Sequence, residues 1–185
     1  MDGIAWAASA MVAARARLEI ATENLANVST DGFRRSAASG FLTAHGVAIE
    51  RRSAAGQGAL RHTGRDLDLA IVGEGAFRLR DASGSVRETR AGAFVRRDDG
   101  TLRDARGGTL LGTHGAFRGA RFDASALGLP AASRVQSGFL ESSSVDAIAE
   151  MIDVLAAERS FESAQKAVAA IDLSRQKSAE AARVK

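Results

Sequence analysis

Three histidines and a run of three serines are the first residues in this sequence whose types could carry chemistry. A metal site needs ligands at short, regular spacings, and a nucleophilic serine needs a sharp turn and a nearby base. His45, His62 and His114 lie far apart, and none has a partner at metal-ligand spacing. The serines at 142–144 lack the G-x-S-x-G setting. We therefore expect loop or surface histidines, no metal, no cofactor and no enzymatic activity.

Two further patterns have a structural interpretation as well as a chemical one. Asp66 and Asp68 could form a carboxylate pair, but they alternate with apolar residues in a strand-like run, which predicts that both face solvent. The Gly73-Glu74-Gly75 segment lacks the third glycine and the following helix of a dinucleotide-binding loop. We interpret this segment as a turn.

Composition excludes several classes of protein. The 185 residues include 25 Lys and Arg against 22 Asp and Glu, and the arginines are scattered among the acids. A nucleic-acid-binding protein typically clusters its basic residues beside stacking aromatics, so we expect no nucleic-acid binding. No run of about 18 apolar residues occurs, which predicts no membrane insertion. Asp2 and the arginines at positions 15 and 17 do not fit a cleavable signal peptide.

Apolar residues recur every seven positions between residue 3 and about residue 28, which predicts a helix with a heptad seam. One seam position holds Ile4, Met11, Leu18 and Leu25, and the other holds Ala7, Ala14, Ala21 and Val28. Small side chains allow a partner helix to approach closely but bury little apolar area. We expect this helix to depend on a partner for its stability.

A second heptad pattern runs from residue 139 to the end of the sequence. Its two seam positions hold Ala147, Val154, Phe161 and Val168, and Ala157, Ala164 and Ile171. Ile148, Met151, Ile152 and Leu155 widen the apolar face, so this helix should have more than one neighbour. Ser144 is the expected N-cap, with Asp146 in the first turn.

Between these helices, residues 40 to about 128 are rich in glycine and contain short alternating apolar runs. Leu67, Leu69 and Ile71 alternate in one run, which continues beyond the 73–75 turn. Asp99-Gly100 is a hairpin signal, and residues 81–85 predict another turn. We expect a small antiparallel β domain of six to nine short strands.

These zones predict an α+β fold in which the N- and C-terminal helices pair, coiled-coil-like, and a small antiparallel β domain lies between them in the sequence. The predicted divisions are 1–35 for the N-terminal helix and its joint, 36–136 for the β domain and 137–185 for the C-terminal helix.

Four segments closely resemble motifs of the flagellar rod and hook family of axial proteins, in the family's order. They are NLANVSTDGFRRS (24–36), TGRDLDLAIVGEGAFRL (63–79), TRAGAFVRRDDGTLRDARGGTLLG (89–112) and SGFLESSSVDAIAEMIDVLAAERSFESAQKAV (137–168). Two positions depart from the family pattern. Ser144 stands where Asn is usual, and Ala76 replaces the first of two aromatic residues.

The resemblance implies a structural subunit of the bacterial flagellar basal-body rod, of the proximal or distal type, that self-assembles into a helical axial tube and transmits torque. It implies partners among the rod and hook subunits, further copies of the chain, and export through the flagellar type III apparatus without a cleavable signal peptide. Two alternatives stay open: a hook or hook-associated subunit, and a small monomeric β-domain binding protein.

The N-terminal motif also predicts how the first helix joins the β domain. Asn24 and Asn27 lie on one face near the helix end, where asparagine can bond terminal carbonyls or adopt a left-handed cap. Gly32 is expected at positive φ, and Phe33 is expected to bury against the C-terminal helix or a neighbouring subunit. These four residues complete a predicted assembly set that also contains Ile4, Met11, Leu18, Leu25, Val154, Phe161 and Val168.

Overall fold

The computed structural model describes residues 3–43, 46–54 and 56–183, so His45 lies outside the described residues. The chain divides into two compact units. Unit 1 contains helix α1 (Gly3–Ala26), the hairpin of β1 (Ser36–Thr43) and β2 (Gly46–Ser53), and helix α2 (Ala147–Arg183). Unit 2 contains the loop Asn27–Arg35 and residues 56–145. The predicted α+β class, with paired terminal helices and a β region between them in sequence, is confirmed.

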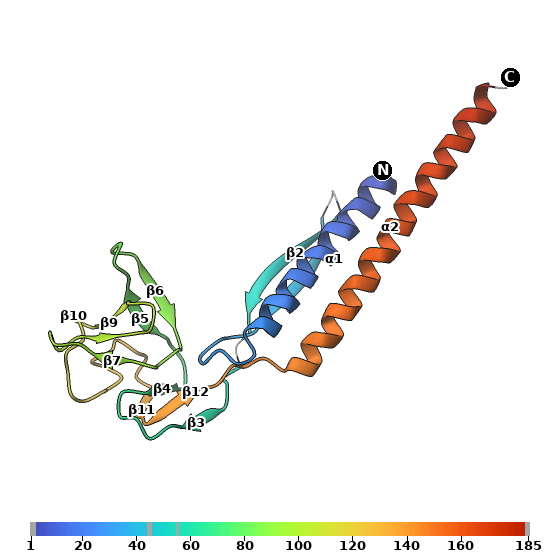
Figure 1. Cartoon of the computed structure of the whole chain (residues 1–185). Coiled ribbons are helices and arrows are strands. Elements are labelled where there is room, and N and C mark those ends of the chain that lie inside the picture. Colours follow the sequence, from blue (N-terminus) through green and yellow to red (C-terminus); the bar gives the residue numbers. More distant parts are fainter. Residues whose placement is uncertain (1–2, 44–45, 55, 184–185) are drawn as a thin grey trace. The chain divides into compact units, whose positions relative to one another are not determined.

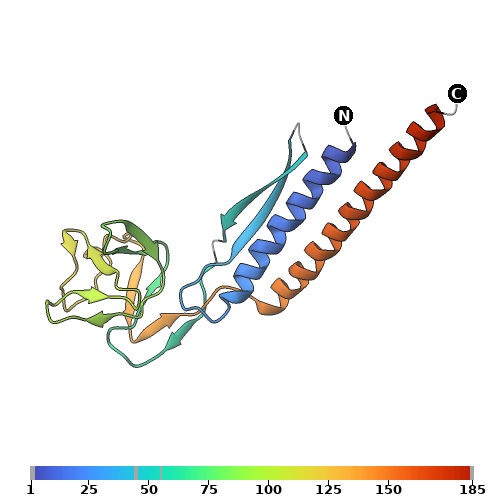
Figure 2. The same ribbon diagram turned by 45° about the horizontal axis from the view of Figure 1, so that its top comes forward.

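In unit 1, α1 lies between α2 on one side and the β1–β2 hairpin on the other (Figures 1 and 2). Gly3 lies beside Ile171, and Asn24 is hydrogen-bonded to Glu150, so the two helices run antiparallel. Because α1 begins beside Ile171, the last turns of α2 extend past Gly3, the first described residue of α1.

The heptad pattern places the small residues at the centre of the helix pair. Ala14, Ala21, Ala157 and Ala164 are buried, whereas the larger seam side chains are half-buried. Val28 is an exception, because it lies beyond the end of α1 and is 38% exposed. The predicted seam is therefore wrong at this last position.

A second stripe on α1 faces the hairpin. Ala13 and Ile20 are buried although they lie outside the heptad seam. Ser9 is on the same stripe, since its hydroxyl accepts a hydrogen bond from the Val47 backbone amide at 3.3 Å. The hairpin thus packs on α1 within unit 1. Its two strands add to the eight strands β3–β10, so ten described strands lie between residues 36 and 116, where six to nine were expected. The domain limits 1–35, 36–136 and 137–185 stay a prediction.

The start of α2 differs from the expectation. The Asp146 carboxylate accepts hydrogen bonds from the backbone amides of Ile148 at 2.9 Å and Ala149 at 3.3 Å, so Asp146 is the N-cap. Ser144 was the predicted cap, and that assignment is wrong. Its hydroxyl instead accepts a hydrogen bond from the Arg35 backbone amide at 2.9 Å.

One face of α2 stays exposed in the single chain. Ile148, Met151, Ile152 and Leu155 are between 54% and 72% exposed. These residues flank the seam, so the apolar face is wider than α1 covers, as the sequence predicted. No described helix is both long and apolar enough to cross a membrane.

Unit 2 is built from short antiparallel strands. Its main sheet has the order β6-β5-β9-β8-β7, with β10 beside β9, and two further pairs join β11 to β4 and β12 to β3. The strands are β3 (Leu60–His62), β4 (Leu69–Val72), β5 (Phe77–Arg80), β6 (Val86–Thr89), β7 (Val95–Arg96), β8 (Leu102–Arg103), β9 (Thr109–Gly112), β10 (Gly115–Ala116), β11 (Arg134–Ser137) and β12 (Phe139–Glu141).

The predicted alternation and turns of this region are confirmed. Leu69, Ile71, Phe77 and Leu79 point into one core, where the rings of Phe77 and Phe94 meet edge to face at 5.4 Å. The β7–β8 hairpin turns at Gly100, which has a φ of +78°. Residues 81–85 turn the chain from β5 to β6.

The expectation of a solvated Asp68 is wrong. Its side chain is buried and accepts hydrogen bonds from the Arg65 guanidinium, including one of 3.0 Å from Nε. Burial alone would raise the pKa of the Asp68 carboxyl. The hydrogen bonds from Arg65 and Thr63 and the charges of Arg65 and Arg61 outweigh burial and hold this pKa below its usual value.

We expect Asp68→Asn to lower the free energy of unfolding of unit 2 at neutral pH and to flatten its acid dependence. The contribution of the ionised Asp68 carboxylate to the free energy of unfolding is fully present above the pKa of about 3.9 that it has in the unfolded chain. This contribution is lost as pH falls through the lower pKa of the folded protein. The difference between the native protein and the variant should therefore shrink as pH falls from about 5 to 2. This difference is measured by unfolding each protein in urea at several pH values and monitoring the exchange of the β4 amides. The exposed neighbour Asp66, changed to Asn, is the control. A gap between native and Asp68→Asn that does not change with pH would contradict the assignment.

Candidate functional site

The loop Asn27–Arg35, which we call the joint loop, contains the most specific part of the N-terminal motif. Its backbone turns twice, with the Thr30 amide donating to the Asn27 carbonyl at 3.1 Å and the Phe33 amide to the Thr30 carbonyl at 3.2 Å. Gly32 has a φ of +70°, which confirms the predicted positive φ.

The joint loop is hydrogen-bonded to strand β12 and the chain that follows it. The Gly32 amide donates to the Glu141 carbonyl at 2.6 Å, and the Ser144 amide donates to the Phe33 carbonyl at 3.0 Å. A Cβ on Gly32 would overlap the backbone of Arg90 and Ala91 and would stand 2.7 Å from the Ala91 Cα. Glycine is therefore required here for two reasons, its dihedral angle and the close approach of another segment.

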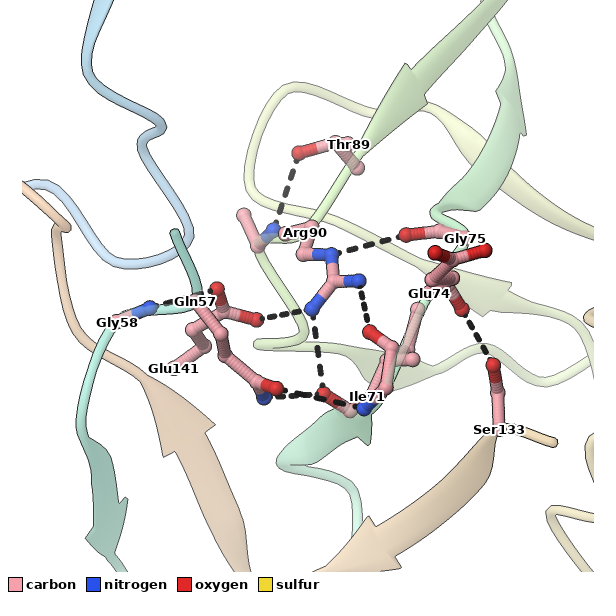
Figure 3. A network of polar contacts seen from close by, with 11 residues as sticks. Gln57, Gly58, Ile71, Glu74, Gly75, Thr89, Arg90, Ser133 and Glu141 are labelled. Carbon is pink, nitrogen blue, oxygen red and sulfur yellow. Dashed lines mark hydrogen bonds and ion pairs between the residues drawn. The ribbon is translucent and has the colours of Figure 1, made fainter. Parts of the chain in front are cut away.

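A buried ion pair lies beside this contact (Figure 3). Arg90 is 3% exposed and Glu141 is 1% exposed, and Arg90 Nη1 lies 2.9 Å from Glu141 Oε2. The same guanidinium donates to the carbonyls of Ile71 and Gly75, at 3.3 and 2.9 Å, and to the carbonyl of Gly73. The Arg90 guanidinium thus donates hydrogen bonds to three backbone carbonyls between residues 71 and 75.

The carboxylate of Glu141 extends this network to the segment before β3. Its Oε1 accepts a hydrogen bond from the Gly58 amide at 3.1 Å. The neighbouring Gln57 donates from Nε2 to the Ile71 carbonyl at 2.6 Å and accepts from the Gly73 amide at 3.3 Å. Four segments of unit 2 that are distant in sequence are therefore fastened at one buried point (Figure 3).

This site holds distant segments of unit 2 together. Among the described residues no cluster of three or more histidine, aspartate or glutamate side chains could hold a metal ion. The ring of His62 packs edge-on against Phe139 at 4.9 Å, which is a structural contact. The 73–75 segment is the expected turn, and its carbonyls face the Arg90 guanidinium.

Asn24 and Asn27 differ from the expectation in their local roles. No described non-glycine residue has a positive φ, so neither asparagine forms a left-handed cap. Asn24 is fully buried in α1 and bonds to the backbone of Ser36 in β1. The Asn27 side chain instead accepts a hydrogen bond from the Thr30 hydroxyl at 3.1 Å.

The structure distributes the predicted assembly set over both units. Ile4, Met11, Leu18, Leu25, Val154, Phe161 and Val168 are half-buried along the α1–α2 pair of unit 1. Gly32 and Phe33 belong to the joint loop of unit 2, where Phe33 is also half-buried. Their role in assembly stays a prediction.

Arg90, Glu141 and Glu150 were missed by the sequence analysis. Each lies inside a motif segment, but the sequence alone does not distinguish a buried charged residue from a solvated one. The sequence offered no signal for Glu141 in particular, because residues from 139 onward were assigned to the C-terminal helical pattern and the structure instead places Phe139–Glu141 in strand β12. The ion pair itself depends on residues 51 positions apart.

Paired chain termini, a β region inserted between them and a glycine-dependent joint define a class of proteins built from helical arms and a β unit. Two family models match this chain in those arms. The model described as "Flagella basal body rod protein" matches residues 4–34, and "Flagellar basal body rod FlgEFG protein C-terminal" matches residues 136–180. Both terminal segments of the chain are thus similar to the flagellar basal-body rod family.

Individual relatives carry the names of two kinds of flagellar protein. The chain is 33% identical to the flagellar basal-body rod protein FlgG of Agrobacterium fabrum, over 55% of this chain and 49% of the relative. It is 38% identical to the flagellar hook protein FlgE of Rhizobium meliloti, over 56% of this chain and 28% of the relative. The match to FlgE of Salmonella typhimurium is 35% identical over 57% of this chain and 28% of the relative. The chain thus spans about half or less of the length of these curated relatives.

Proposed function

We propose that this chain is a structural subunit of the bacterial flagellar basal-body rod, which assembles with further copies and other axial subunits into a helical tube that transmits torque. The observation that carries the proposal is that the two segments matching the rod family models are the ones that pair as α1 and α2. The exposed apolar face of α2 supports the proposal, because an exposed apolar patch of this kind typically marks a surface that contacts another protein.

A hook subunit is the second candidate, since the chain is also similar to proteins named as hook proteins. The rod is favoured because the chain spans 49% of the rod relative but only 28% of the hook relatives. We further propose that the protein acts without catalysis or cofactor, is located in the basal body, and is exported through the flagellar type III apparatus without cleavage of a signal peptide.

An epitope-tagged chain in strains lacking its own gene tests the proposal. A rod subunit should restore motility and remain in basal bodies purified from a second strain that lacks the hook protein. A hook subunit should be absent from those hookless basal bodies. Full motility without the gene, or a tagged protein found only in the cytoplasm, would reject both candidates.

Two aspartate substitutions separate the internal seam of α2 from its exposed face. Phe161→Asp puts a charge against α1, which should cost several kcal/mol and release the α1 amides to exchange in the purified protein. Ile152→Asp lies at a position that is 61% exposed and should change the stability of the isolated chain by less than about 0.5 kcal/mol.

Both variants should fail to enter the rod, the first because α1 and α2 separate and the second because a neighbour cannot cover the charge. Amide exchange measures the first effect, and the amount of each variant in purified basal bodies measures the second. Normal assembly of Ile152→Asp would mean that no neighbour covers this face.

A further inference from the structure

A buried polar cluster in unit 1 joins α1, α2 and β1. The Asn24 amide donates from Nδ2 to the Ser36 carbonyl at 2.7 Å and to Glu150 Oε2 at 3.1 Å. Its Oδ1 accepts a hydrogen bond from the Ser36 amide at 2.8 Å. The side chain thus pairs with a peptide group as a neighbouring strand would. Asn24 is 0% exposed and Glu150 is 1% exposed.

The rest of the helix pair has little to fix its register. Alanine recurs every seven residues on both seams, and the larger apolar residues recur with the same period. Sliding α2 along α1 by one heptad therefore sets alanine against similar neighbours and changes the buried apolar area little. An Ala-rich heptad pattern specifies that two helices pack together, but it specifies their register only weakly.

Asn24 and Glu150 break this repeat. They face one another in the observed register, and a slip of one heptad in one direction would bring Ala157 to Asn24 in place of Glu150. A methyl group accepts no hydrogen bond, so Asn24 would keep its bonds to Ser36 but lose the one to Glu150. Losing a hydrogen bond to a buried carboxylate costs more than shifting an alanine contact.

We propose that Asn24 and Glu150, together with the Ser36 peptide, set the register of the α1–α2 pair and fix where the β1–β2 hairpin leaves α1. The cluster selects one of several registers that the apolar seam would accept. It acts in the single folded chain, so the proposal does not depend on the function in the flagellum.

Spin labels test the register directly, because the chain has no cysteine and introduced thiols are the only ones present. Val12→Cys and Ile148→Cys place labels on exposed positions of α1 and α2, 68% and 72% exposed and outside the seam. A slip of one heptad moves α2 by about 10 Å along α1. The otherwise native chain should give a single label-to-label distance.

Replacing both Asn24 and Glu150 with leucine should keep the helix content, measured by circular dichroism, and add at least one distance population shifted by about 10 Å. Glu150→Gln keeps an acceptor oxygen for the Asn24 amide and should retain the single distance. One unchanged distance in the double leucine variant would overturn the proposal. Loss of the helices in that variant would also overturn it, because the cluster would then be needed for stability and not for register.

Discussion

Arg90→Ala is expected to lower the free energy of unfolding of unit 2 by about 3–5 kcal/mol. The substitution leaves the Glu141 carboxylate buried without its cation and removes donors from the carbonyls of Ile71, Gly73 and Gly75. Removing one member of a buried pair costs much more than the pair contributes, because the remaining charge cannot be solvated. Amide exchange of the β4 and β5 strands in increasing urea measures the loss.

The matched control is a second arginine–carboxylate pair of the same unit. Arg61 lies 3.2 Å from Asp31, with side chains that are 55% and 34% exposed. Arg61→Ala should therefore cost about 0–1 kcal/mol. Combining Arg90→Met with Glu141→Leu should cost less than Arg90→Ala alone, because no isolated charge remains. Equal losses for Arg90→Ala and Arg61→Ala would contradict the role assigned to the buried pair.

Gly32→Val is expected to destabilise unit 2 in two separable ways. A valine at a φ of +70° is strained by about 1–3 kcal/mol, and its Cβ overlaps the backbone of Arg90 and Ala91. Moving that backbone aside costs about a further 1–3 kcal/mol, as overpacking does in cores, and disturbs the Arg90 network. Urea unfolding followed by amide exchange of β12 gives the total.

Gly84→Val separates the two contributions. Gly84 has a φ of +86°, but a Cβ there would meet no atom within 4 Å. The Gly84 variant should therefore show the dihedral strain alone, and the Gly32 variant should lose about 1–3 kcal/mol more. If both lost the same amount, the close approach at Gly32 would be irrelevant to stability. In cells, the proposed export of an unfolded chain predicts that Gly32→Val is still secreted and yet is absent from purified basal bodies, because an unfolded chain has no joint loop to distort.

Periodicity was sufficient to predict the two helices and all of their seam except the position of Val28. A heptad repeat is a local property of the chain, and a residue's place in it is independent of the rest of the fold. Turns were equally accessible, because Asp99-Gly100 and Gly32 depend on the dihedral freedom of glycine, which is also local.

Local reasoning failed where a side chain had two plausible environments. Asp68 alternates with leucines and reads as solvated, yet the Arg65 guanidinium makes its burial possible. Ser144 and Asp146 both cap helices well, and only the docking of the joint loop assigns the serine hydroxyl to the Arg35 amide. The packing of the β1–β2 hairpin on α1 was also invisible, because the buried Ala13 and Ile20 belong to no seam.

By itself, the sequence determined that two helices with matching heptads flank a small antiparallel β region, that Gly32 takes a positive φ and that its motifs resemble those of the flagellar rod and hook family. Only the tertiary structure decided that Arg90 pairs with Glu141 and Asn24 with Glu150. The physical reason is that burying a charge or an amide is favourable only when partners distant in sequence arrive together. No local sequence pattern indicates such a contact, because it forms only when the chain has folded.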